Sequence, residues 1–319
     1  MIQLVLARPL PRHPLLKRHC LCDPDTLLEI AEQASRSGAD IDDLAERFSL
    51  ILHDLRMGGA WKRTNRGRLP RTEEMLRAHI APALGEELVF LDIGASDAVT
   101  TVEALRALRA AFGDRVHAYA ADVNLWLLRY RYGPTVEYRA GDGEPIMVRL
   151  GPFGLRLARQ RHGLAQRHGI FAGLYLGWHW LRREMELDAR ISLVNPIARR
   201  DAGLELLELD CLRREERLRE RVSAIRASNV LNLGYFTPAQ IRLAVGHFHF
   251  YLREGGCLVI SQNGDGARGE AENGTVWLKR AKGFRRAEDF GRGSEIAALV
   301  DEWQPETAGD RPAVSAGLH

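Results

Sequence analysis

The spacing of apolar residues predicts three helices in the first quarter of the chain. The first begins at about residue 25, and its apolar positions are Leu27, Leu28 and Ala31. The second begins at about residue 40, and its apolar positions are Ile41, Leu44, Phe48, Ile51, Leu52 and Leu55. A third helix is predicted from Thr72 to about Ala81, where a proline follows. Residues 1–22 carry three prolines and are predicted to be irregular.

Short apolar runs that alternate with helical patterns then predict five buried strands. They lie at residues 88–91, 116–121, 204–210, 222–227 and 257–261. Two further segments, 274–280 and 283–290, predict a terminal antiparallel hairpin. Strands that alternate with helices are typical of a doubly wound α/β sheet. We therefore expect an α/β fold with a helical N-terminal cap and a hairpin at its end.

The regular alternation breaks between the second and third predicted strands. Residues 125–132 predict a helix, and residues from about 133 to 203 exceed what a simple crossover needs, which predicts an insertion. Two strands, 136–139 and 145–150, are expected to pair as a hairpin within it. The stretch 163–181 is rich in glycine, histidine and aromatic residues, and it predicts a cover over a pocket, a peripheral contact with a membrane, or an ordinary buried helix.

Composition limits the protein to an ordinary globular class. Hydrophobic residues make up 45% and charged residues 27% of the chain, and the net charge of +3 predicts no nucleic-acid partner. The four cysteines include one C-x-C pair without a second pair, so we predict no metal site and a reducing, cytoplasmic location. The predicted domains are a cap and linker at 1–71, a main domain at 72–304 and a disordered tail at 305–319; the oligomeric state stays open.

The stretch from Leu88 to Thr101 carries the most informative motif. It reads as a strand, a tight turn and a helix, with Asp92 two residues before Gly94 and small residues at Ser96 and Ala98. Small side chains let a ligand approach the backbone, and free N–H groups at the start of a helix receive polar ligand atoms. Asp122 ends the second strand, where an acid accepts hydrogen bonds from ribose hydroxyls in nucleotide-binding sheets. The alternative for Asp122 is a helix cap.

Taken together, these motifs resemble class I S-adenosylmethionine-dependent methyltransferases, whose loop reads D/E-x-G-x-G-x-G. Asp210 after the third strand and the Asn229-Val-Leu run before Leu252-Arg-Glu-Gly-Gly256 add to the resemblance, with Glu254 in place of the usual proline. It covers about residues 85–290 without the insertion. The resemblance implies a Rossmann-like fold, S-adenosyl-L-methionine as cofactor, and methyl transfer to a small-molecule or lipid-like acceptor bound beneath the insertion.

The resemblance also implies a role for each matched residue. The loop would hold the methionine part of the cofactor, Asp92 would orient its ammonium, Asp122 its ribose, and Asp210 with Cys211 its adenine. The predicted cofactor-binding residues are Asp92, Ile93, Gly94, Ala95, Ser96, Asp122, Val123, Asp210, Cys211, Ser228 and Asn229. Ser228 and Asn229 would face the methyl group at the end of the fourth strand. Asn229 and His179 are the candidate catalytic residues.

Other functions remain open at this point. A weaker resemblance, carried by Asn229, Tyr235, Phe236 and Gln240, points to chemotaxis receptor glutamate methyltransferases, although that family's aromatic-rich segment is absent. A nicotinamide-dependent oxidoreductase is disfavoured because the second glycine of its fingerprint is missing. A non-catalytic module of the same fold that binds a nucleotide or a partner is the third alternative.

Overall fold

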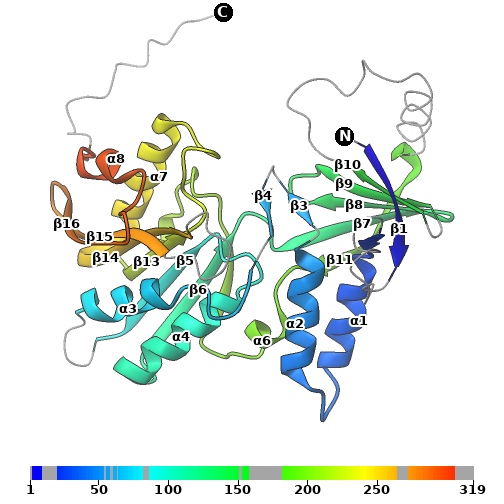
Figure 1. The fold of residues 1–319 in the computed structure, drawn as a ribbon, viewed down its shortest axis with the longest axis horizontal. Helices are drawn as coiled ribbons and strands as arrows, with labels where there is room; N and C mark the ends of the chain where they lie inside the picture. The colour runs from blue at the N-terminus through cyan, green and yellow to red at the C-terminus, as the bar shows by residue number, and fades with distance from the viewer. Residues whose placement is uncertain are drawn as a thin grey trace, which may run out of the picture. The chain divides into compact units, whose positions relative to one another are not determined.

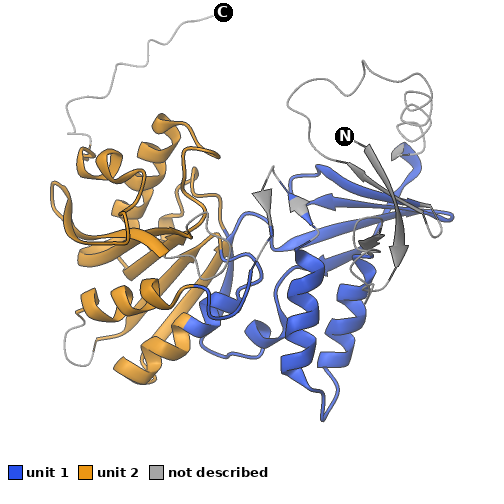
Figure 2. Ribbon diagram, in the orientation of Figure 1, with its two compact units in different colours: residues 1–68, 95–103, 122–208 blue, residues 69–94, 104–121, 209–319 orange. Residues whose placement is uncertain are grey.

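The computed structural model describes residues 2–8, 20–53, 55–57, 60–62, 64–81, 86–150, 153–157, 182–263 and 272–305 of the 319-residue chain. The chain forms two compact units, each assembled from three separate stretches of sequence (Figure 2). Unit 1 holds residues 1–68, 95–103 and 122–208, and unit 2 holds residues 69–94, 104–121 and 209–319. The predicted boundary at residue 71 stays a prediction.

A seven-stranded sheet in the order β12-β6-β5-β13-β14-β15-β16 confirms the predicted α/β fold class (Figure 1). Its strands are β12 (Leu204–Glu208), β6 (Val116–Asp122), β5 (Leu88–Ile93), β13 (Val222–Ser228), β14 (Leu252–Asn263), β15 (Glu272–Arg280) and β16 (Gly283–Phe290). The strand β5 runs parallel to β6 and β13, and β13 runs parallel to β14. The last two strands are antiparallel, as predicted for a terminal hairpin.

The helices of unit 2 include α3 (Pro70–His79), α7 (Pro238–Tyr251) and α8 (Ala297–Asp301). Of these, α3 and α7 begin at a proline, which is a start signal in the sequence. The helix α4 (Val99–Phe112) follows β5 and has residues in both units. Thr237 caps α7, and its hydroxyl accepts the backbone N–H of Gln240 while the Gln240 side chain accepts the N–H of Thr237. Buried residues every three or four positions, including Ile241, Val245 and Phe248, give α7 its apolar face.

Unit 1 contains a second seven-stranded sheet, in the order β11-β7-β8-β9-β10-β1-β2. Its strands are β11 (Glu186–Ser192), β7 (Trp126–Tyr132), β8 (Thr135–Ala140), β9 (Pro145–Leu150), β10 (Phe153–Leu157), β1 (Ile2–Arg8) and β2 (Cys20–Cys22). The strands β8 and β9 pair antiparallel, which confirms the predicted hairpin. The remaining strands enlarge that hairpin into a full sheet, to which the N-terminal strands β1 and β2 belong.

Two local predictions for this sheet were wrong. Residues 125–132 were expected to be helical, but β7 pairs on one side with β8 and on the other with β11, and these two ladders override the local preference. The N-terminal 22 residues were expected to be irregular, but β1 pairs with β10 near residue 155 and with β2. A pairing partner about 150 residues away leaves no local signal in the sequence.

Both predicted N-terminal helices are present, as α1 (Asp25–Ala34) and α2 (Ile41–Leu52). Their apolar faces share one core with the sheet of unit 1. From the helices this core takes Leu27, Ile30, Phe48, Ile51 and Leu52, and from the strands it takes Leu127, Tyr138, Met147 and Ile191. The helical pair is therefore an integral layer of unit 1. Two short strands, β3 (Arg56–Met57) and β4 (Ala60–Trp61), follow α2 as a separate ladder.

In the described part of the chain, no helix combines the length and the apolar character that crossing a membrane requires. The expected disordered tail and the segment 163–181 fall almost entirely outside the described residues.

Candidate functional site

The turn after β5 has an unusual backbone. Gly94, Ser96 and Ala98, three alternate residues, have φ angles of +71°, +59° and +66°. This left-handed region suits glycine and costs other residues roughly 1–2 kcal/mol each. A Cβ atom added to Gly94 would lie 2.0 Å from Cγ2 of Val230, so this position also excludes any side chain on steric grounds. The backbone of the turn thus has the form that three glycines would give it.

Ser96 has a hydrogen-bonded backbone N–H and a side-chain hydroxyl without a protein partner among the described residues. Its backbone N–H donates to Oδ2 of Asp122 at 2.9 Å. Its hydroxyl Oγ is buried and has no hydrogen-bond partner among the described residues. A buried hydroxyl without a partner is unfavourable by about 1–3 kcal/mol. We therefore expect the hydrogen-bond partner of this hydroxyl to be a ligand bound at the turn.

Asp122 is the last residue of β6, as predicted, and its carboxylate is almost fully used within unit 1. Besides Ser96, it accepts the backbone N–H of Asn124 at 2.9 Å and the ammonium of Lys62 at 2.7 Å, both on Oδ1. Lys62 Nζ also donates to the backbone oxygen of Asn124 at 2.8 Å, and the lysine side chain is only 7% exposed. Val123, in contrast, is exposed to 52%.

Lys62 was missed by sequence reasoning. It lies within the predicted cap and linker at 1–71, and nothing in its spacing distinguishes it from the arginines nearby. Only the folded chain brings residues 60 positions apart into contact.

Asp92 has a partner that the sequence did not indicate. Arg226, on the neighbouring strand β13, donates to both carboxylate oxygens of Asp92, at 2.9 Å from Nε and 2.5 Å from Nη2. Both side chains are almost completely buried. The fork-shaped guanidinium matches a carboxylate in two parallel hydrogen bonds. Asp92 therefore takes part in an ion pair inside the sheet, and its predicted contact with a cofactor ammonium stays a prediction.

The ends of β13 and β14 are tied together by polar side chains. Ser228 Oγ lies 2.7 Å from Ser261 Oγ, and both hydroxyls are buried. Asn229 has a φ of +59°, donates from Nδ2 to Oδ1 of Asn263 and accepts the Asn263 backbone N–H with its own Oδ1. This reciprocal pair fixes the amide of Asn229, so the residue acts first as a connector between strands. Its predicted catalytic role stays a prediction.

Asp210 and Cys211 lie in a turn two residues beyond the end of β12. Asp210 Oδ1 accepts the backbone N–H of Leu212 at 2.9 Å, which is a local turn contact. Cys211 is buried, and burial raises the pKa of its thiol to about 12, so the thiol stays protonated at neutral pH. His247 donates from Nδ1 to the backbone oxygen of Cys211 at 2.9 Å, which explains why this histidine is buried in α7.

Asn195 supports the turn from within unit 1. It caps α6 (Pro196–Arg199), and its Nδ2 donates to the backbone oxygen of Ala45 at 2.9 Å. Asp97, fully buried in the turn, accepts the hydroxyl of Ser49 at 2.6 Å and lies 3.3 Å from Asn195 Nδ2. The hydrogen bond from Ser49 to Asp97 therefore anchors the turn to α2.

The predicted site residues fall into two groups. Within unit 1, Ser96 contacts Asp122 directly. Within unit 2, Asp92 and Ser228 lie on the parallel strands β5 and β13. His179 lies outside the described residues.

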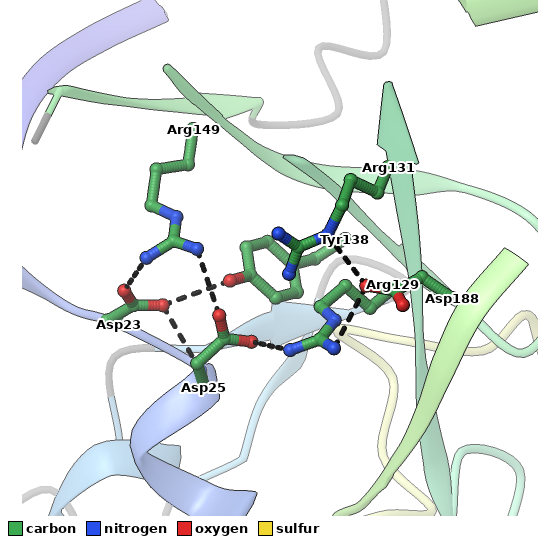
Figure 3. A network of polar contacts seen from close by, with 7 residues as sticks. All are labelled: Asp23, Asp25, Arg129, Arg131, Tyr138, Arg149 and Asp188. Atoms are coloured by element: carbon green, nitrogen blue, oxygen red, sulfur yellow. Dashed lines mark hydrogen bonds and ion pairs between the residues drawn. The ribbon is translucent and has the colours of Figure 1, made fainter. Parts of the chain in front are cut away.

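A second polar cluster in unit 1 is a clamp between secondary-structure elements (Figure 3). Arg129 of β7 and Arg149 of β9 each donate to Asp25 at 2.9 Å. Asp188 of β11 accepts Arg131 at 2.8 Å and Arg129 at 2.9 Å. The cluster is completed by Asp23, which accepts Arg149 and, at 3.0 Å, the hydroxyl of Tyr138. Burial raises the pKa of Tyr138, so its hydroxyl stays a donor.

Comparison with known proteins gives no family for the chain. No model of a known protein family matches it, and no curated protein matches it. Among solved structures, a Burkholderia thailandensis 1,6-didemethyltoxoflavin-N1-methyltransferase with bound S-adenosylhomocysteine matches 86% of this chain and 76% of its own, at 14% identity and a TM-score of 0.32.

Two other solved structures show how distant these likenesses are. The CMeT domain of the citrinin polyketide synthase matches 58% of this chain, at 14% identity and a TM-score of 0.29, and the [4+2]-cyclase SpnF matches 64%, at 11% identity and a TM-score of 0.29. The chain spans about a third of the first structure (31%) and half of the second (51%).

Proposed function

We propose that the protein binds S-adenosyl-L-methionine at the carboxyl end of β5 and β6 and transfers its methyl group. The observation that carries this proposal is the turn at Gly94, Ser96 and Ala98. Its left-handed backbone falls at the three positions where the resembling methyltransferases have glycine. Its buried Ser96 Oγ has no partner among the described residues, as expected of an atom that binds a ligand.

The resemblance assigns each part of the cofactor to particular residues. Backbone N–H groups at the start of α4 and Ser96 Oγ would receive the polar atoms of the methionine moiety. Asp122, an acceptor-only group at the end of β6, would accept the ribose hydroxyls. Asp210 and Cys211 would border the adenine. Ser228 and Asn229 would lie near the methyl group, since ligands of open α/β sheets bind at the carboxyl ends of the strands.

The bound cofactor would supply a sulfonium methyl group that needs little activation. The protein's contribution would then be to align the acceptor with this methyl group and to exclude water. We extend the proposal to a small-molecule or lipid-like acceptor. Its support is chain order, since β7 begins only four residues after Asp122 and the sheet of β7 to β11 therefore starts beside the proposed ribose position. A cytoplasmic location also belongs to the proposal.

Titration calorimetry with S-adenosylhomocysteine and with NAD tests the proposal. We expect binding of S-adenosylhomocysteine only, and Ser96→Ala should weaken it several-fold because a ligand contact is lost. A radiolabelled methyl-transfer assay over phenols, amines, thiols and lipids should then reveal the acceptor. Absence of S-adenosylhomocysteine binding would contradict the proposal, and binding without transfer to any acceptor would favour a non-catalytic module.

A further inference from the structure

We propose that Lys62 competes with the cofactor ribose for Asp122 and thereby sets the affinity of the site. The inference rests on the proposed function, which assigns Asp122 to the ribose. In the structure the lysine ammonium holds that carboxylate at 2.7 Å. The cofactor must therefore displace Lys62 or share Asp122 with it.

Counting hydrogen bonds favours displacement. A carboxylate offers about four acceptor positions. Three at Asp122 are taken, by Lys62 and Asn124 on Oδ1 and by Ser96 on Oδ2. Two ribose hydroxyls need two positions, and only one is left. The contacts from Ser96 and Asn124 come from backbone N–H groups and belong to the local fold, so the flexible lysine side chain is the partner that can leave.

The surroundings of Lys62 make this competition costly for the ligand. The ammonium is buried and has two acceptors, Asp122 Oδ1 and the backbone oxygen of Asn124. Separating a buried ion pair leaves both charges to be satisfied again. Lysine has a long aliphatic stem that allows its charge to return to water. Part of the binding free energy of the ribose is thus spent on moving Lys62, and the site binds more weakly than Asp122 alone would allow.

The test is the affinity of Lys62→Met for S-adenosylhomocysteine, measured by titration calorimetry. Methionine keeps the length of the side chain and removes the charge. We expect binding about tenfold tighter or more, because one charge-assisted hydrogen bond no longer has to be broken. The ligand-free variant should melt at a lower temperature than the wild type, because Asp122 loses its partner. Weaker binding by the variant would overturn the proposal, since it would mean that Lys62 assists the ligand.

Two controls separate competition from a general effect on the fold. The 2′,3′-dideoxy analogue of S-adenosylhomocysteine has no ribose hydroxyls, so its affinity should be the same for the variant and the wild type. Lys279→Met removes another buried lysine, whose Nζ donates to the backbone oxygen of Leu252 and pairs with Glu220 at 3.7 Å. This control should lower the melting temperature without changing the affinity.

The outcomes also separate this inference from the proposed function. If wild type and Lys62→Met bind S-adenosylhomocysteine equally, the competition is refuted and the cofactor assignment stands. If neither binds it, both fail. Equal tightening with the dideoxy analogue would show that Lys62 does not act through the ribose and would overturn the proposal as well.

Discussion

At the scale of single residues, Ser96 and Ala98 adopt a conformation that is unfavourable for their own side chains. Ser96 combines a φ of +59° with a buried hydroxyl that has no partner among the described residues. Ser96→Gly should therefore stabilise the free protein, by about 1 kcal/mol, because both penalties disappear while the greater conformational entropy of glycine in the unfolded chain offsets part of the gain. Urea unfolding measures this gain. A destabilised glycine variant would show that the hydroxyl has a favourable contact in the free protein.

At Gly94 in the same turn, a substitution should instead destabilise the protein. Gly94→Ala places a Cβ against Val230 and keeps a φ of +71°. We expect a loss of about 2–4 kcal/mol in the free energy of unfolding, from steric overlap and from the left-handed backbone together. Gly113→Ala is the matched control, because it has a φ of +81° but nothing within 4 Å of its added Cβ. Gly113→Ala should lose only the smaller part of the unfolding free energy, the part that comes from the left-handed backbone.

At the scale of elements, the start of α3 depends on a carboxylate from a distant strand. Glu272 of β15 accepts the backbone N–H of Arg71 at 2.7 Å, the N–H of Thr72 at 3.0 Å and the Thr72 hydroxyl at 2.6 Å. Glu272→Ala would leave these donors without their acceptor in a buried place, and we expect a loss of about 2–4 kcal/mol in unfolding free energy. Glu272→Gln keeps an acceptor and should lose less. Equal losses would mean that the charge, rather than the cap, matters.

The clamp of Figure 3 gives unit 1 a dependence on pH. The hydrogen bond from Arg131 lowers the pKa of Asp188, with a further contribution from Arg129. A lowered pKa in the folded state contributes stability above about pH 4, and this contribution is lost as the pH falls through the folded pKa. We therefore expect the wild type to lose more stability than Asp188→Asn between pH 5 and pH 3. Urea unfolding at both values measures the difference, and parallel curves would contradict the expectation.

At the scale of the whole molecule, each unit is made from stretches that are far apart in the sequence. Phe48 of α2 is fully buried in the core that it shares with β7, β8, β9 and β11. Phe48→Ala should lower the unfolding free energy by about 3–5 kcal/mol and increase hydrogen exchange at the amides of β8. Leu50 lies on the same helix but is 38% exposed, so Leu50→Ala should change the unfolding free energy by no more than about 0.5 kcal/mol. Unchanged hydrogen exchange at β8 would mean that the packing of α2 does not stabilise the sheet.

The features of the fold that the sequence predicted are those with a local pattern of residues. Helices α1, α2 and α3 and the strands of the α/β sheet carry local periodicity or start signals, so the sequence predicted them. The strand β1 and the pair of Lys62 with Asp122 depend on partners far along the chain, and no local pattern records them. The acids at positions 92 and 122 were found at strand ends as expected. Their cationic partners were not, because one basic side chain resembles another until the chain folds.

The ion pair between Asp92 and Arg226 has a consequence for how this sequence can diverge. Losing either partner alone would leave a buried charge and would destabilise the fold by about 3–5 kcal/mol, whereas joint replacement by apolar residues of similar volume is often tolerated. Positions 92 and 226 should therefore co-vary among descendants of this chain. An acid at position 92 should accompany a cation at position 226, and an apolar residue at one should accompany an apolar residue at the other. We expect the acid of the loop motif to be inherited together with its arginine.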